Sequence, residues 1–255
     1  VTGNDQASGA RATPFRTISR AAGSLKPGDT CVIHTGMYRE TVRPASSGTP
    51  GHPIRIVAAP GEDVVVSGAD LVAGTWTRAE GAARTVSLAT HPGQVFVDGK
   101  PMMEARWPNA PLAPVMERLT VRAEAGEGTD YDSLCDATLP TGDFSGARVL
   151  IWPGSMWNNA MREVVAYEPG TSFRFHPPFK ATKATYHKED PYRPKPTNPY
   201  ILFGSRAALE QPGEWFPDSA AGVLMLIFPA STSPRNAIVE VRSRDYGFDL
   251  NGLSH

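Results

Sequence analysis

The chain has little cysteine, no long apolar run and no excess of charge of either sign. Only Cys31 and Cys135 occur among 255 residues, so neither a disulfide framework nor a zinc cluster is visible. The longest apolar stretch, residues 222–229, is far shorter than the roughly 20 residues of a membrane-spanning helix. Lys and Arg number 25 against 26 Asp and Glu, which gives no electrostatic support for nucleic acid or a membrane as partner.

Glycine and proline, in contrast, are plentiful. The chain has 24 of each, while hydrophobic residues still make up 40% of it. Turn formers at this density, combined with enough apolar residues for a core, predict a folded protein of many short strands and many turns. A helical bundle and a disordered tail are both disfavoured.

A single short helix is predicted near the start of the chain. Ile18, Ala21, Ala22 and Leu25 recur at helical spacing, and Thr17 stands before them as an N-cap. We expect this amphipathic helix to cover the open end of the strand region that follows it.

Short strands come next, at residues 30–34, 40–43, 53–58 and 64–67. They are too close together for helical crossovers and lack two-residue hairpin turns. A solenoid that turns after each strand therefore fits best. Cys31 lies in the first of these apolar runs and is expected to be a buried free thiol.

The middle of the chain has a different pattern, with longer loops, all five tryptophans and hairpin signals. One such signal is the pair Asp98–Gly99, which can join two strands by a tight turn. This stretch predicts an antiparallel β-sandwich or barrel. Within it, residues 179–199 hold four prolines and many charges and are expected to form a long surface loop.

The first pattern then returns. Residues 239–252 repeat the alternation of residues 54–68, namely two spaced apolar residues, a polar turn, two more and a glycine. We therefore predict that the strands around Ile56 and Val241 pair in parallel as neighbours. The predicted fold is all-β: a right-handed parallel β-helix with a helical cap, interrupted by an insertion. Its parts are residues 1–73, the inserted domain 74–234, and the return 235–255.

Three strings of the sequence resemble known proteins. The opening, GNDQASG followed by PFRTISRAAGSLKPGDTCVIHTGMYRETV and PIRIVAAPGEDVVVSG, resembles secreted pectate-lyase-like β-helix proteins. VFVDGKPMMEARWPN at residues 95–109 and GEWFPDSAAGVLML at 213–226 resemble β-helical glycoside hydrolases with a β-sandwich insertion. That group includes exo-acting galactosidases, xylosidases and fucosidases.

This resemblance implies a secreted, carbohydrate-active protein whose catalytic acids lie on later coils, beyond His255. The chain stops inside a coil, so we expect it to be a fragment that needs further β-helix coils or a second chain as partner. Glycoside hydrolysis requires two carboxyl groups across one bond. Asp245 and Asp249 are available in the returning coil. Asp245 is expected in a turn and Asp249 at an outward strand position, so both are better interpreted as solvated carboxylates.

Candidate substrate-binding residues are Trp107, Trp157 and His187. A tryptophan ring can stack on the apolar face of a sugar. Trp107 stands in the turn of the ARWPN string. Trp157, followed by two asparagines, is the better sugar-facing candidate, whereas Trp152 and Trp215 adjoin apolar strands and are expected to fill a core. His187 lies in the charged loop and could reach over a binding groove, although a solvated loop is the simpler alternative.

Three functions remain open: a glycoside hydrolase acting on a polysaccharide or oligosaccharide, a polysaccharide lyase, and a non-catalytic β-helix binding or adhesin module. No cofactor is expected for the hydrolase, whereas a lyase commonly uses calcium. The acidic stretch at residues 124–136 lacks the full ligand spacing of a calcium loop, so we interpret it as a solvated acidic loop and predict no metal site there.

Overall fold

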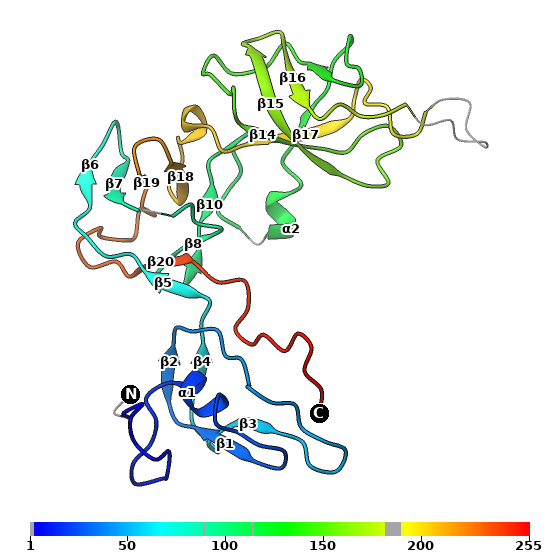
Figure 1. Cartoon of the computed structure of the whole chain (residues 1–255). Helices are drawn as coiled ribbons and strands as arrows, with labels where there is room; N and C mark the ends of the chain where they lie inside the picture. Colours follow the sequence, from blue (N-terminus) through cyan, green and yellow to red (C-terminus); the bar gives the residue numbers. More distant parts are fainter. Residues whose placement is uncertain (1–2, 89, 114, 182–189) are drawn as a thin grey trace. The chain divides into compact units, whose positions relative to one another are not determined.

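The computed structural model describes residues 3–88, 90–113, 115–181 and 190–255. It divides into two compact units, which we treat separately: the first unit is Val1–Leu71 with Glu240–His255, and the second unit is Val72–Val239. The protein is all-β with few helices and several sheets, as expected (Figure 1). No helix in the described part of the chain is long and apolar enough to cross a membrane.

The predicted helix is present as α1 (Ile18–Ala22). Thr17 is its N-cap, and the Thr17 hydroxyl accepts a hydrogen bond from the backbone N–H of Arg20 at 3.2 Å. The carboxylate of Glu40 accepts from the N–H groups of Ile18 and Ser19. Both interactions satisfy backbone donors that the first turn of a helix leaves free.

The first unit contains five short strands before the second unit begins. They are β1 (Thr30–Ile33), β2 (Gly36–Tyr38), β3 (Arg55–Ala58), β4 (Val64–Val66) and β5 (Ala69–Leu71). β1 pairs with β3 and β2 with β4, both in parallel. A further parallel bridge joins Val42 to Phe248. The small core beneath them contains Ile18, Ile33, Tyr38 and Val42.

The predicted pairing of Ile56 with Val241 is wrong. Ile56 lies opposite Cys31 in β1, whereas Val241 belongs to β20 (Val239–Arg242) and lies opposite Asp70 of β5, antiparallel. β5 and β20 are the strands by which the chain leaves and re-enters the first unit, so they run side by side in opposite directions. Apolar alternation recurs wherever a strand has one buried face, and it does not specify the partner.

Cys31 is free, as predicted, but only half-buried. Burial of the thiol raises its pKa above the ordinary value. Side chains alternate along a strand, so Cys31 faces the small core while the residues on either side of it point outward. The thiol lies at the edge of that core and not at its centre.

The second unit contains a five-stranded sheet. In spatial order its strands are β10 (Met103–Glu104), β18 (Glu214–Asp218), β19 (Val223–Leu226), β7 (Arg84–Ser87) and β6 (Thr77–Arg78). β10 and β18 are parallel, and the other neighbours are antiparallel. Nearby, β8 (Val95–Val97) and β9 (Lys100–Pro101) form the hairpin predicted from Asp98–Gly99, both of which have positive φ.

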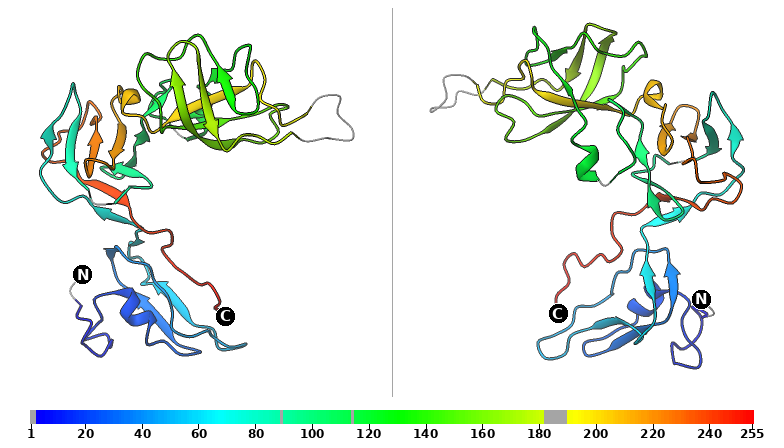
Figure 2. Two further views of the ribbon diagram at one scale, coloured as in Figure 1. Left: turned by 45° about the horizontal axis from the view of Figure 1, so that its top comes forward. Right: turned by 180° about the vertical axis from the view of Figure 1, so that it is seen from behind.

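A seven-stranded sheet completes the second unit, with its strands, coloured green to yellow, side by side in Figure 2. In order they are β11 (Arg106–Trp107), β17 (Pro199–Phe203), β14 (Arg148–Ile151), β15 (Ala160–Glu168), β16 (Ser172–His176) and β13 (Ser133–Cys135), while β12 (Ala123–Glu124) also pairs with β17. The short helices α2 (Val115–Arg118) and η1 (Arg206–Ala208) lie in connecting segments.

Neither sheet of the second unit closes on itself among the described residues, so the barrel alternative is wrong. Most strand pairings in this part of the structure are antiparallel, and a parallel β-helix is not established by them. The core beneath the seven-stranded sheet combines the aromatic side chains Phe144, Phe173, Phe175 and Tyr200 with alanine, leucine, isoleucine and valine side chains. Rings and aliphatic side chains together give the close packing of a protein interior.

Candidate functional site

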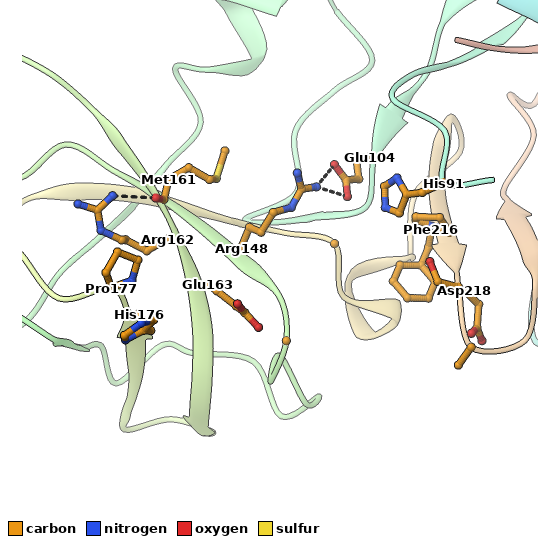
Figure 3. A pocket seen from close by; sticks show the side chains of 15 residues that line it. His91, Glu104, Arg148, Met161, Arg162, Glu163, His176, Pro177, Phe216 and Asp218 are labelled. Atoms are coloured by element: carbon orange, nitrogen blue, oxygen red, sulfur yellow. Dashed lines mark hydrogen bonds and ion pairs between the residues drawn. The ribbon is translucent and has the colours of Figure 1, made fainter. Parts of the chain in front are cut away.

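A pocket of about 740 Å³ opens in the second unit (Figure 3). This volume is typical of sites for small ligands. The side chains that line it come from both sheets and the loops beside them, and include His91, Glu104, Arg148, Met161, Glu163, His176, Phe216 and Asp218. Charged and polar groups are frequent among them.

The parallel pairing of β10 with β18 builds one wall of the pocket. It sets Met103 opposite Glu214 and Glu104 opposite Trp215, although the two strands are about a hundred residues apart in sequence. Side chains alternate along a strand. Phe216 and Asp218 therefore share one face of β18, and both border the pocket, whereas Trp215 is buried.

Glu104 and Arg148 form an ion pair inside the pocket. Nη2 of Arg148 lies 2.5 Å from each carboxylate oxygen of Glu104. The Glu104 side chain is only 18% exposed and that of Arg148 is 43% exposed, so water screens this pair less than a surface pair. The remaining N–H groups of Arg148 can still donate to a ligand.

Gly204 allows the ion pair its position. A Cβ at this residue would lie 2.9 Å from Oε1 of Glu104, and the backbone φ of +73° is itself unfavourable for a side chain. Glycine suits this position chiefly because of its positive φ, and a side chain here would also displace the carboxylate of Glu104.

A row of three polar side chains crosses the seven-stranded sheet at the pocket. Arg148 of β14 is opposite Glu163 of β15, which is opposite His176 of β16. Neighbouring strands lie about 4.8 Å apart, so the row is about 10 Å long. Glu163 is exposed, and its carboxylate has no ion pair or hydrogen bond with another residue in the described ranges.

Phe216 and His91 lie together at one end of the pocket, as Figure 3 shows. Asp218 follows Phe216 on the same strand, and one of its carboxylate oxygens accepts from the N–H of Ala221 at 2.9 Å. An aromatic face beside carboxylates and a guanidinium suits a ligand that has an apolar face and many hydroxyl groups.

Glu104 is committed to this ion pair, because both of its carboxylate oxygens accept from the Arg148 guanidinium. Its carboxylate therefore holds Arg148 in place within the pocket. In the described ranges, no group of three or more His, Cys, Asp or Glu side chains could hold a metal ion.

Of the sequence-predicted binding residues, Trp107 and Trp157 do not line this pocket. Trp107 is half-buried, with its ring centroid 6.0 Å from that of Tyr200 in the core. Trp157 is 65% exposed in the loop before β15. His187 lies outside the described residues. The structure thus places Trp157 at the surface and Trp107 mainly against the core.

Buried Arg106, next to Trp107, holds the turn that both residues share. Its Nε donates to the carbonyl of Pro108 at 2.9 Å and its Nη1 to the carbonyl of Arg118 at 2.9 Å. The desolvation of the guanidinium lowers the pKa of Arg106 to about 10. This side chain stabilises the structure and is inaccessible to ligand.

The two aspartates of the returning segment are engaged in ion pairs. Asp245 pairs with Arg242, and Asp249 lies 2.6 Å from Arg43. The N–H of Asn251 and the Arg43 guanidinium hold the pKa of Asp249 below its ordinary value. Asp249 is therefore a poor proton donor for catalysis.

The acidic stretch in the second unit is more structural than expected. Asp130 pairs with Arg193 at 3.1 Å and Asp132 with Arg174 at 2.8 Å. Buried Asp136 accepts from the hydroxyl of Tyr200 at 2.7 Å. These carboxylates tie loops to the sheet, so the interpretation of a solvated acidic loop holds for only part of the stretch.

Sequence reasoning missed the pocket, although a signal for part of it was present. Glu104, Phe216 and Asp218 belong to the two inserted strings that resemble glycoside hydrolases. The row from Arg148 to His176 left no such signal, because it depends on the register of three strands.

Comparison with known proteins gives matches of very different extent. A model of a family of proteins of unknown function, DUF1565, matches residues 1–46. The uncharacterized protein YwoF of Bacillus subtilis (strain 168) is 41% identical over 66 residues, which are 26% of this chain and 14% of that protein.

Two solved structures are similar over nearly the whole chain. One, described as a glycoside hydrolase, has a TM-score of 0.71 at 20% identity and covers 99% of this chain and 46% of its own. The other, a complex of XylC with xylose, has a TM-score of 0.45 at 20% identity and covers 97% of this chain and 31% of its own. The first shows a shared fold. The chain spans less than half the length of each of these matched proteins.

Proposed function

We propose that this chain is the N-terminal part of a glycoside hydrolase that degrades a polysaccharide or oligosaccharide. In this proposal the second unit supplies a sugar-binding pocket, and the acid/base carboxylate pair lies beyond His255. The observation that carries it is the pocket itself, where the Glu104–Arg148 ion pair, the free carboxylate of Glu163 and the ring of Phe216 converge. The fold shared with a glycoside hydrolase supports it.

The chemistry of the pocket matches the surface of a sugar. A pyranose has hydroxyl groups around its edge and an apolar face of C–H groups. Arg148 can donate to hydroxyl oxygens, Glu163 can accept from hydroxyl hydrogens, and Phe216 can pack on the apolar face. The Glu104 carboxylate then acts as a positioning group that holds the guanidinium of Arg148 in place.

The fold part of the proposal is a right-handed parallel β-helix for the first unit. The pairings β1 with β3, β2 with β4, and Val42 with Phe248 support it, because each joins successive turns of the chain in parallel. Residues 72–239 would then interrupt the second turn. Further coils, or a second chain, are the proposed partners of this unit. Because a polymeric glycan lies outside the cell, secretion belongs to the same proposal.

A non-catalytic carbohydrate-binding module is the second candidate. The commitment of Glu104 to Arg148 favours it, because the pocket then has groups for binding and no free acid at that position. A polysaccharide lyase is distinguished by its products, since only a lyase generates an unsaturated uronate. Assays of the full-length protein on neutral and uronate polysaccharides separate the three functions.

The binding proposal is tested on the 255-residue chain by calorimetric titration with neutral and uronate disaccharides. We expect Arg148→Met to weaken binding by about tenfold or more, since a hydrogen bond to a charged group contributes about 1.5–3 kcal/mol. Arg174→Met is the matched control: Arg174 lies on the same sheet, pairs with Asp132 and does not line the pocket. Equal affinities for both variants, or no binding of any saccharide by the unaltered chain, would contradict the proposal.

A further inference from the structure

The pocket is elongated, and its two ends differ from its middle. Figure 3 shows Phe216 with His91 at one end and His176 with Pro177 at the other, with Arg148 and Glu163 between them. The row from Arg148 to His176 alone measures about 10 Å across two strand spacings. The pocket then continues beyond Arg148 to Glu104 and to the wall formed by β18.

Each end of the pocket combines an apolar ring with a polar group. At one end the ring is that of Phe216 and the polar groups are His91 and Asp218. At the other end the ring is that of Pro177 and the polar group is His176. The middle of the pocket, between them, is charged, with the donor Arg148 next to the acceptor Glu163. Apolar faces therefore alternate with hydrogen-bonding groups along the length of the site.

A single sugar is too small to contact both ends. With single bonds of about 1.5 Å, a pyranose ring and its hydroxyl groups reach about 6 Å. This is shorter than the row from Arg148 to His176, and it leaves Phe216 out of reach of a ring seated against Pro177. Linked sugars, in contrast, present one apolar face and one set of hydroxyl groups per ring, repeated along the chain.

We propose that the pocket holds an oligosaccharide of at least two linked sugars, laid across strands β14, β15 and β16. One ring packs against Phe216 and hydrogen-bonds to Arg148, and a later ring lies against Pro177 and hydrogen-bonds to His176. This inference rests on the proposed function, since it specifies the ligand of the same pocket. The substrate class is thus a glycan chain and not a free monosaccharide.

The test measures affinity against chain length. The 255-residue chain is titrated with β-1,4-linked xylo-oligosaccharides of one to six units and, in parallel, with the matching galacto-oligosaccharides. For the series that binds, we expect affinity to rise about tenfold or more from one to three units and then to level off. The monosaccharide should occupy the Phe216 end, where the ion pair and the aromatic ring lie together.

Variants at the two ends make the test specific. Phe216→Ala should weaken the monosaccharide and the trisaccharide alike. His176→Ala should weaken the trisaccharide by about fivefold or more and leave the monosaccharide unchanged. His176 is an exposed residue at the end of β16, so its replacement leaves the core intact. Arg174→Ala, also exposed on β16 and away from the pocket, serves as the control.

The outcomes separate the inference from the function on which it rests. A monosaccharide that binds as tightly as the trisaccharide would overturn the inference and leave the proposed function standing. The same holds if His176→Ala weakens the monosaccharide as much as the trisaccharide, or neither of them. Absence of binding by every saccharide in both series would instead overturn the proposed function.

Discussion

The two units of this chain use β-structure in opposite ways. In the first unit, strands of three or four residues pair in parallel over a small core of Ile18, Ile33, Tyr38 and Val42. In the second unit, strands of two to nine residues pair mainly in antiparallel over a larger core that includes several aromatic rings. Short parallel strands cannot bury much surface by themselves, so the first unit depends on neighbouring turns of chain more than the second unit does.

The outward faces of the strands differ as well. In the first unit, Val32 lies opposite Val57 and Met37 opposite Val65, and all four are about half exposed. In the second unit, the corresponding outward row contains Arg148, Glu163 and His176. Apolar cross-strand pairs stabilise a sheet but bind little, whereas a polar row offers hydrogen-bonding groups to a ligand. Under the proposed function, the groups that bind the sugar therefore lie in the second unit.

The largest expected effect on stability comes from truncating one buried ring in the core of the second unit. Phe173→Ala should lower the free energy of unfolding by about 3–5 kcal/mol, because Phe173 is fully buried among other rings. All five tryptophans lie in the second unit, so tryptophan fluorescence during urea unfolding reports on that unit alone. Val165→Ala, exposed on the same sheet, is the control and should change stability by less than about 0.5 kcal/mol.

A second measurement decides whether the units are energetically separate. Ile33→Ala removes core volume from the first unit only. If the units unfold independently, the tryptophan transition of this variant stays where it is in the unaltered chain. A shift as large as that of Phe173→Ala would show that the two units unfold together. The two cores would then not contribute independently to stability.

The next largest effect is expected from pH. Glu214 is fully buried, and burial raises its pKa to about 7, even though two backbone N–H groups, of Glu210 and Gln211, donate to one of its oxygens. The folded state therefore binds the proton more tightly than the unfolded state. The resulting stabilisation is complete below pH 4.5 and is lost as pH rises through 7, by up to about 3 kcal/mol.

Glu214→Gln should remove this pH dependence. Urea unfolding followed by tryptophan fluorescence at pH 5 and pH 8 provides the measurement. Between pH 5 and pH 8, we expect the free energy of unfolding of the second unit to fall more in the unaltered chain than in the variant. Glu168→Gln, at an exposed position at the end of β15, should retain the full dependence. A variant with the same pH slope as the unaltered chain would show that another group titrates in this range.

A smaller effect is expected at the helix of the first unit. Thr17→Ala removes the side-chain acceptor for the N–H of Arg20 and should destabilise the first turn of α1 by about 1 kcal/mol. Because the first unit has no tryptophan, the measurement is hydrogen exchange of the amides of residues 18–22. Thr49→Ala, in an exposed turn, is the control. Equal exchange rates in the two variants would mean that the Thr17 cap does not stabilise the helix.

Local features of the structure could be predicted from sequence, whereas long-range ones could not. The cap at Thr17 and the hairpin at Asp98–Gly99 depend on a few adjacent residues, and both predictions are confirmed. The pairing of Val241 was predicted wrongly, because alternation defines a buried face and leaves the neighbour undefined. Partner choice is decided by where the chain leaves and re-enters a unit, which no local pattern encodes.

The pocket shows the same limit. Glu104 and Phe216 could be associated only through strings that resemble known enzymes, since the pairing of β10 with β18 is not apparent from either string alone. Trp157 was selected from sequence as an exposed aromatic residue, and it is exposed. Exposure follows from its polar neighbours, but membership of a pocket depends on the arrangement of distant strands. Its role in binding therefore stays a prediction.

The test of Trp157 in glycan binding has the smallest expected effect. It distinguishes the pocket from the surface of the second unit outside the pocket. Trp157 is 65% exposed, so Trp157→Ala should change the free energy of unfolding by less than about 0.5 kcal/mol. It does not line the pocket, so affinity for a trisaccharide should stay unchanged. If its ring is a second contact for a long glycan, retention on a polysaccharide should weaken by about two- to tenfold, the loss expected for one exposed stacking contact of about 0.5–1.5 kcal/mol. Affinity electrophoresis in a xylan gel, beside calorimetry with the trisaccharide, measures both properties. Weakened trisaccharide binding would place Trp157 at the pocket, and unchanged retention on the polysaccharide would remove it from the glycan-binding surface.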